Sequence, residues 1–175
     1  YEAVGAEVVI DAPRRLEFSR LDCAVLAVPH QALMGPARPA LRPERGGPTV
    51  NVLVTHGQFA SLGEARGTMD FGGAPLSLED LAPPAWDYIA LGHYHVTHAV
   101  ADNARYAGSL EYLPPNPWGQ LQDQAERGVK GKGYLLVELP GLRVTERIVT
   151  PARRHVELEP IRAAGLTAKQ IDAQI

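Results

Sequence analysis

One segment constrains the fold of this chain more than any other. Residues 87–95 read Asp-Tyr-Ile-Ala-Leu-Gly-His-Tyr-His, an apolar run that stops at two histidines one residue apart. A second segment of the same design, residues 50–57, ends in Thr-His-Gly. Both patterns predict a buried strand followed by a turn that contains glycine. Because neutral imidazole is the commonest transition-metal ligand, His56, His93 and His95 predict a metal site held on a rigid sheet.

Composition places the chain among ordinary globular proteins. It has 175 residues, of which 45% are hydrophobic and 21% charged. A net charge of -3 argues weakly against DNA as a partner, although a channel can be basic on an acidic protein. The single cysteine, Cys23, excludes an internal disulfide and fits a reducing compartment, so we expect a cytoplasmic protein. No apolar run reaches about 18 residues, so we expect no membrane span.

Short apolar runs predict most of the strands. We expect strands at residues 8–10, 24–28, 50–54 and 88–91, with a connecting strand in 14–20. Residues 99–100, 105–107 and 134–139 have the spacing of an antiparallel meander or of one face of a sandwich, with a hairpin turn at Asp102-Asn103. Residues 142–149 alternate as a half-exposed strand does.

The remaining segments predict few helices. Ser77 and Asp80 indicate a capped short helix over residues 77–81, while residues 35–48 are rich in proline and glycine and predict a loop. Residues 114–132 are polar and are expected to be irregular. Thr167 is the expected cap of a helix over residues 168–175. We therefore assign residues 1–150 to one domain and residues 151–175 to a linker and the start of a second.

The histidine pattern has competing interpretations. A zinc finger is excluded because one cysteine cannot supply the thiolates, and a His-Glu-x-x-His protease is excluded because that motif is absent. Each histidine alone is better explained as a satisfied turn residue, but a pair plus a third in an equivalent position favours a metal. For His30 we favour a structural or rim role over ligation, for His98 a place in the outgoing strand over ligation, and for His155 a structural role.

Other conspicuous residues favour plain roles. Cys23 is expected to be a small core residue, Trp86 and Trp118 to be packing anchors, and Lys130 and Lys132 to lie in an exposed loop.

The sequence offers no convincing acidic residue at a strand end to join the histidines as a metal ligand. Hard divalent ions also need carboxylates, yet Asp87 precedes its strand and Asp102 lies in a turn. The chain therefore reads as half of an active site. It also begins at Tyr1 in a strand-like stretch, so we expect it to be a piece of a longer protein.

These residues resemble the second half of the calcineurin-like metallophosphoesterases, and most closely their DNA-repair exonuclease subunits of the SbcD type. The likeness is carried by Thr-His-Gly at 55–57, by residues 87–95, by Tyr-Ala-Gly-Ser at 106–109 and by Lys-Gly-Tyr-Leu-Leu-Val-Glu at 132–138. It covers roughly residues 50–175. The stretch from Arg153 is similar to that family's link to a capping domain.

The resemblance implies both a fold and a chemistry. The fold would be α+β, a double β-sheet sandwich flanked by helices and present as its C-terminal half. His56 and His93 would bind one divalent ion and His95 a second, with Mn²⁺ as the expected metal. The reaction would be metal-dependent hydrolysis of a phosphodiester in DNA, and Tyr94 and Ser109 are candidate substrate-facing residues. The nuclease branch also implies an SMC-like ATPase partner and a homodimer, and the sequence decides neither.

The chain departs from the family in one respect. The Asp-x-His, Gly-Asp and Gly-Asn-His-Asp motifs, which would supply the remaining ligands and the catalytic histidine, are absent. We expect those catalytic residues upstream of Tyr1. Two rival functions stay open: a phosphoesterase of the same fold acting on nucleotides or phosphoproteins, and a non-catalytic scaffold module. Endonuclease and exonuclease activity are not distinguished.

Overall fold

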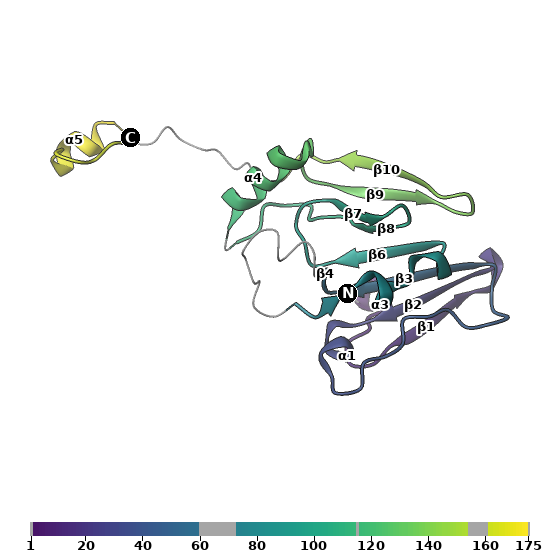
Figure 1. Ribbon diagram of the computed structural model, residues 1–175. Helices are drawn as coiled ribbons and strands as arrows, with labels where there is room; N and C mark the ends of the chain where they lie inside the picture. The colour runs from purple at the N-terminus through teal and green to yellow at the C-terminus, as the bar shows by residue number, and fades with distance from the viewer. Residues whose placement is uncertain (1, 60–72, 115, 154–160, 175) are drawn as a thin grey trace.

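The computed structural model describes residues 2–59, 73–114, 116–153 and 161–174. Its main element is a six-stranded sheet in the order β1-β2-β3-β6-β8-β7 (Figure 1). The strands are β1 (Arg14–Phe18), β2 (Cys23–Val28), β3 (Val50–His56), β6 (Tyr88–Gly92), β7 (His98–Ala101) and β8 (Ala104–Tyr106). The four central strands are parallel to one another, and β1 and β7 are antiparallel edge strands.

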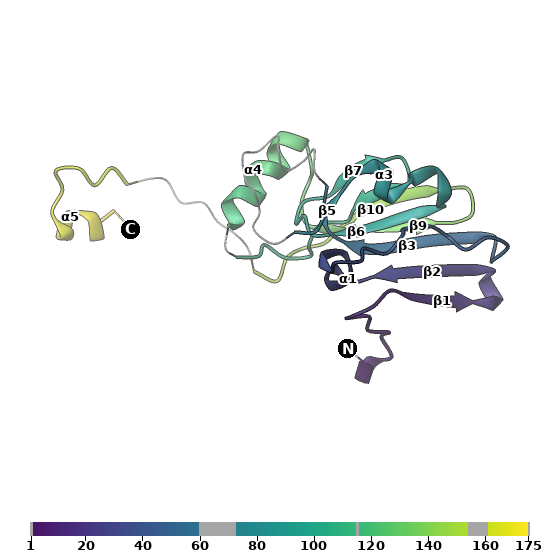
Figure 2. The same cartoon turned by 60° about the horizontal axis from the view of Figure 1, so that its bottom comes forward.

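Two small strand pairs and several helices complete the described chain. The pairs are β4 (Gln58–Phe59) with β5 (Pro75–Leu76), and β9 (Gly133–Glu138) with β10 (Arg143–Ile148). The α-helices are α1 (His30–Met34), α3 (Leu78–Leu81), α4 (Pro117–Arg127) and α5 (Ala168–Asp172), and the 3₁₀ turns are η1 (Glu2–Val4), η2 (Ser19–Leu21) and η3 (Pro83–Ala85). Figure 2 shows α4 beside one end of the sheet and α5 apart from it.

One face of the six-stranded sheet carries the core. Leu53 of β3 and Ile89 of β6 are paired neighbours in the ladder, and neither side chain is exposed. Leu33 of α1, Leu76 of β5 and Leu81 of α3 belong to the same buried cluster. Burying such side chains stabilises the fold by about 1.5–3 kcal/mol each, so this face is what joins the short helices to the sheet.

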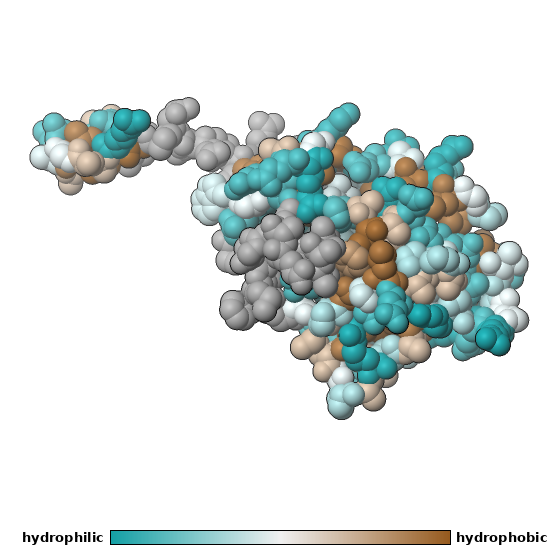
Figure 3. All heavy atoms as spheres, in the orientation of Figure 1, coloured by the Kyte–Doolittle hydropathy of each residue, from teal (hydrophilic) through white to brown (hydrophobic). Residues whose placement is uncertain are grey.

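The opposite face is covered less completely. Val52 and Val54 of β3 point there because successive side chains of a strand alternate between faces. Val54 is 41% exposed, and Phe18 of β1, whose partner Cys23 shares this face, is 45% exposed. On the side of the molecule drawn in Figure 3, hydrophobic residues likewise gather in a patch within a mostly hydrophilic surface.

Much of the predicted secondary structure is confirmed. The chain is an α+β protein, as expected, and the strands predicted at 14–20, 24–28, 50–54, 88–91, 105–107, 134–139 and 142–149 are present within a few residues of those bounds. Ser77 caps α3 with a reciprocal bond between its backbone and Asp80, and Thr167 caps α5, which ends at Asp172. Among the described residues, no helix is long and apolar enough to cross a membrane.

Two of the strand predictions are wrong. Residues 8–10 form no strand, because within the described part of the chain the only neighbour of edge strand β1 is β2. Of the expected antiparallel meander, only the β7–β8 hairpin is formed, with its turn at Asp102-Asn103 as predicted. Strand β8 pairs in parallel with β6, and β9 with β10 makes a separate hairpin.

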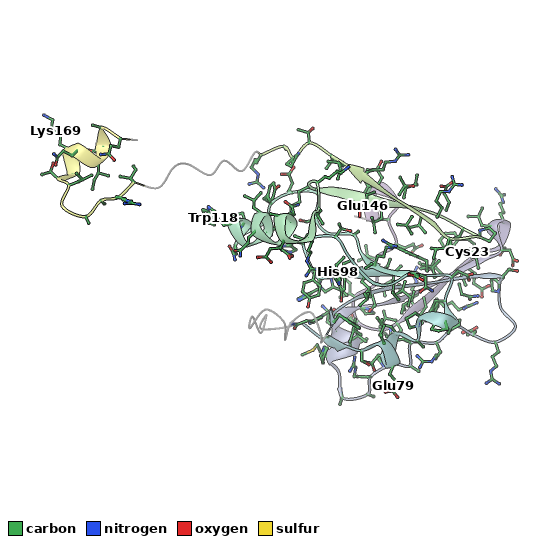
Figure 4. The ribbon with its side chains drawn as sticks, turned by 45° about the horizontal axis from the view of Figure 1, so that its top comes forward. Cys23, Glu79, His98, Trp118, Glu146 and Lys169 are labelled. Carbon is green, nitrogen blue, oxygen red and sulfur yellow. The ribbon has the colours of Figure 1, made fainter. Side chains whose placement is uncertain are left out.

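A third prediction, that residues 114–132 are irregular, is wrong because of α4. Asn116 caps this helix by accepting a hydrogen bond from the Gly119 amide, Pro117 fills its first turn, and Gly128 ends it in a left-handed conformation. Its buried side chains are polar: Gln120, Asp123 and Gln124. The helix therefore has no apolar stripe that a hydrophobic pattern could reveal. Trp118, which Figure 4 shows at the outer side of α4, is 57% exposed, so it is not the buried anchor that we expected, whereas Trp86 is 6% exposed.

Candidate metal centre

Strand register gathers the histidines at one edge of the sheet. Val28 of β2 pairs with Thr55 of β3, and His56 pairs with Gly92 of β6, so the three parallel strands end together. The Thr55 hydroxyl also donates a 3.0 Å hydrogen bond to the Val28 carbonyl. The carboxyl ends of parallel strands are where α/β sheets commonly place their ligand sites. His93 directly follows β6, so the loops that leave β3 and β6 meet here.

The rings of His56 and His93 lie side by side. Their centroids are 5.5 Å apart, with the ring planes at 86°. His56 is exposed, and His93 and His95 are half-buried, so solvent reaches the group. Burial lowers the pKa of His56, and positive charge on His93, His30 and His95 lowers that pKa further. The lowered pKa favours the neutral imidazole, which is the form that binds a metal.

Gly92 is required for this approach. A Cβ atom at Gly92 would lie 2.8 Å from Nδ1 of His56. The Gly57 amide donates a 3.1 Å hydrogen bond to the Gly92 carbonyl, which ties the two turns together directly. His93 itself has φ 135°, a region that side chains other than glycine rarely adopt. Strained backbone of this kind persists only where the surrounding structure supports it.

His30 is a fourth imidazole in the group, which the sequence analysis did not include. Its ring centroid is 6.0 Å from that of His56, at an interplanar angle of 90°. Within the part of the chain that the structure describes, its buried Nδ1 atom has no hydrogen-bond partner. A rim position was one of the two roles favoured for His30, and ligation of a metal by this ring is not tested. The signal in the sequence was its position, two residues after a predicted strand, as for His56 and His93.

The described residues bring no carboxylate into the histidine group. Asp87 lies at the opposite end of β6, where its Oδ2 accepts a 2.7 Å hydrogen bond from the Asn51 amide, and Asp102 lies in the turn between β7 and β8. Among the described residues, no three His, Cys, Asp or Glu side chains are placed so that they could hold one metal ion together. The described chain thus supplies nitrogen donors for a site but not the oxygen donors.

Tyr94, a predicted substrate-facing residue, packs within the site. Its ring contacts those of His93 and Tyr106, at centroid distances of 5.1 and 4.8 Å. Its hydroxyl donates a 3.4 Å hydrogen bond to the Phe59 carbonyl. Half of this side chain is covered, so its contacts support the imidazoles, and a contact with substrate stays a prediction.

Ser109, the other predicted substrate-facing residue, lies behind the histidine turn. Its amide donates to the His95 carbonyl at 3.1 Å, and its hydroxyl lies 2.7 Å from the Glu111 carbonyl and 3.0 Å from the Lys132 ammonium. These contacts give Ser109 a structural role, and its substrate role is an untested prediction. Lys132 is 2% exposed, so its expected place in an exposed loop is wrong. Burial lowers the pKa of Lys132 to about 8.

The other predicted residues lie apart from this group or outside the described residues. His98 is on β7, where it contacts the Arg127 guanidinium of α4 (Figure 4). Cys23 begins β2, at the opposite end of the strand from the histidines, and is half-buried. His155 lies outside the described residues.

Comparison with known proteins yields no relative. No family model matches the chain, and no curated protein or solved structure matches it either.

Proposed function

We propose that this chain provides the imidazole half of a two-metal site that hydrolyses phosphodiesters in DNA, in a protein of the calcineurin-like metallophosphoesterase type. The observation that carries the proposal is the 5.5 Å approach of the His56 and His93 rings at the end of paired parallel strands. Two loops that are 37 residues apart in the chain present the same ligand type to one place. A pair of ordinary turn histidines has no reason to meet in this way.

The half-covered face of the sheet supports the sandwich fold that goes with this function. Val54 and Phe18 leave 41% and 45% of their surface exposed on a face that is otherwise lined by Val52 and Cys23. Exposed apolar surface on a sheet is a common sign of a packing partner. A second sheet laid against this face would bury it and complete the double-sheet architecture.

The donors fit a divalent transition ion in part. Imidazole nitrogen is a good ligand for Zn²⁺, whereas Mn²⁺ needs carboxylate oxygens as well, and the lowered pKa of His56 favours the neutral ring that binds a metal. His56 and His93 would hold one ion and His95 a second. The carboxylates that Mn²⁺ prefers would come from residues outside the described ones.

This chain's own part in the reaction is positioning. When bound, a pair of divalent ions lowers the pKa of a coordinated water and offsets charge on the phosphate oxygens. Strands β3 and β6 fix the backbone at His56 and at the start of the turn that carries His93. The proposal includes a cytoplasmic location, DNA as the substrate, and an SMC-like ATPase and a second copy of the protein as partners.

The test is a nuclease assay on the protein as its gene encodes it. We expect Mn²⁺-dependent cleavage of linear duplex DNA that is lost in His93→Ala, with the circular dichroism spectrum unchanged. Nucleoside phosphodiesters and a phosphopeptide, assayed in parallel, separate a DNA nuclease from a phosphoesterase of other specificity. Full activity of the purified His93→Ala protein would overturn the proposal.

A scaffold module without catalysis is the second candidate. It is favoured by the lack, among residues 2–59, 73–114, 116–153 and 161–174, of any three-ligand group that could hold a metal. Metal content separates the two functions. A scaffold retains no stoichiometric Mn²⁺ or Zn²⁺ after dialysis of the full-length protein, whereas the nuclease retains up to two ions.

A further inference from the structure

A lysine ammonium is buried directly behind the histidine turn. Lys132, immediately before β9, is 2% exposed, and its Nζ donates hydrogen bonds to the His95 carbonyl at 2.8 Å, to the Ser109 hydroxyl at 3.0 Å and to Gln120 Oε1 at 2.7 Å. Lysine is almost never fully buried unless it is paired, because removing its charge from water is costly. The three acceptors use all three N–H groups of the ammonium.

The His95 carbonyl is held from a second side. The Ser109 amide donates to it at 3.1 Å. Gly108 makes this close approach feasible, because it has φ +83° and a Cβ atom there would lie 3.2 Å from the same carbonyl oxygen. The backbone on the far side of the His93-Tyr94-His95 turn is thereby fixed by β9 and by the loop after β8.

Helix α4 in turn fixes the ammonium. Gln120 donates through Nε2 to the Leu113 carbonyl at 2.6 Å, which orients its Oε1 toward Lys132. The Tyr112 ring lies below the ammonium, with Nζ 4.8 Å from the ring centroid, within the range of a cation–π contact. Three separate elements therefore meet at one nitrogen atom, and the turn that carries two of the predicted ligands meets them there.

We propose that Lys132 is a positioning residue for the histidine site, which fixes the backbone of His95 and so the orientation of the His93 and His95 rings without touching metal or substrate. This inference rests on the proposed function, since it takes those rings as ligands. It explains why a turn with φ 135° at His93 needs support from outside its own strand. It also assigns one role to the Tyr-Ala-Gly-Ser and Lys-Gly-Tyr segments, because both donate hydrogen bonds to the His95 carbonyl.

The test compares Lys132→Met with Lys130→Met in the full chain. Methionine keeps most of the side-chain volume but removes the donor that Lys132 supplies to the three acceptors, and Lys130 is an exposed lysine two residues away. Histidine ring signals are followed by NMR in the metal-free protein, after assignment by loss of signal in His93→Gln and His95→Gln. We expect Lys132→Met to shift the His93 and His95 signals and Lys130→Met to leave them unchanged.

Metal affinity is the second readout. We expect Lys132→Met to weaken Mn²⁺ binding about tenfold by calorimetry, as the loss of groups that orient metal ligands does elsewhere, with no change in Lys130→Met. Should Lys132→Met fail to fold, Ser109→Ala removes one acceptor and is expected to cause smaller changes in the same ring signals.

The outcomes distinguish the two proposals. If the wild-type protein binds no Mn²⁺, the proposed function fails, while the metal-free ring signals still decide the role of Lys132. If folded Lys132→Met, or Ser109→Ala in its place, shows unchanged ring signals and unchanged Mn²⁺ affinity, Lys132 is a structural residue only and the inference is wrong.

Discussion

His56 and His93 meet edge to face, with their ring centroids 5.5 Å apart, although 36 residues separate them in the chain. The contact follows from the parallel register of β3 and β6, in which His56 pairs with Gly92. A sheet edge of this kind places His56 on a rigid frame, and the turn that carries His93 starts from the same frame.

Removing either ring should abolish stabilisation by metal. At a concentration 100 times its dissociation constant, a ligand of the native state raises the free energy of unfolding by about 2.7 kcal/mol. We expect Mn²⁺ to raise the melting temperature of the wild-type protein, but not that of His56→Ala or His93→Ala, and EDTA to reverse the effect. Differential scanning calorimetry measures this.

His98→Gln is the matched control. His98 contacts the Arg127 guanidinium of α4 and is not one of the proposed ligands, so Mn²⁺ should stabilise this variant as it does the wild type. Equal stabilisation of His56→Ala and wild type would exclude His56 as a ligand.

Gly92→Ala should disturb the site more than the fold. The added Cβ would lie 2.8 Å from Nδ1 of His56, and the contact is relieved by displacement of the imidazole, the flexible partner. We expect Mn²⁺ affinity to fall about tenfold, in line with other changes that misplace a ligand. Titration calorimetry gives the affinity, and the far-ultraviolet circular dichroism spectrum should stay that of the wild type.

Gly35→Ala is the control for Gly92→Ala, because an added Cβ atom at Gly35 meets no close neighbour. Its Cβ atom would meet nothing closer than 3.5 Å, and its backbone has an ordinary φ of -67°. This variant should bind Mn²⁺ normally. If Gly92→Ala and Gly35→Ala bind Mn²⁺ equally well, the close packing of Gly92 against His56 does not affect metal binding.

The strand ends that carry His56 and His93 were predictable from sequence, whereas the residue that packs beside them, His30, was not. The apolar runs before His56 and His93 mark two buried strands, and alternation of apolar residues marks β10. His30 was missed because its place in the group depends on the register of β2 against β3, where Val28 pairs with Thr55. No local pattern specifies that register, since both strands are apolar and would pair in either direction.

The support behind the turn was hidden for a different reason. Lys132 stands in a Lys-Gly-Lys-Gly segment, which by composition predicts a solvated loop. Its partner helix α4 buries Gln120, Asp123 and Gln124, so neither element carries the hydrophobic periodicity on which sequence analysis relies. Buried polar networks are specified by mutual geometry, and that becomes visible only when the chain is folded.

His30→Gln should raise the pKa of His56. Burial is the largest cause of the lowered His56 pKa, and the charges of His93, then His30, add to it. Removing the His30 charge removes one repulsion, so His56 should take up a proton at a higher pH than in the wild type. The shift is measured by NMR titration of the His56 ring in metal-free protein, and a fall or no change would contradict it.

The same lowered pKa sets the direction of a stability change. In the unfolded chain His56 titrates near its ordinary value of about 6.5, so on acidification the unfolded state takes up the proton first. The contribution of His56 to the free energy of unfolding is therefore full above that pH and falls as the pH drops below it. His56→Gln should show a smaller loss of stability between pH 7 and pH 5 than the wild type.

Tyr106→Phe should weaken the fold beneath the site. Tyr106 is fully buried in β8, and its hydroxyl donates a 2.8 Å hydrogen bond to the Gly57 carbonyl, in the turn that follows His56. Loss of that donor leaves a buried carbonyl unsatisfied, which costs about 1–3 kcal/mol of the free energy of unfolding. Urea denaturation measures the change.

Tyr134→Phe is the control, since Tyr134 is 50% exposed and the change in its free energy of unfolding should be within about 0.5 kcal/mol of zero. Because the Gly57 amide donates to the Gly92 carbonyl, Tyr106→Phe should also lower Mn²⁺ affinity. Equal stability of Tyr106→Phe and Tyr134→Phe would show that the Tyr106 hydroxyl does not hold this turn.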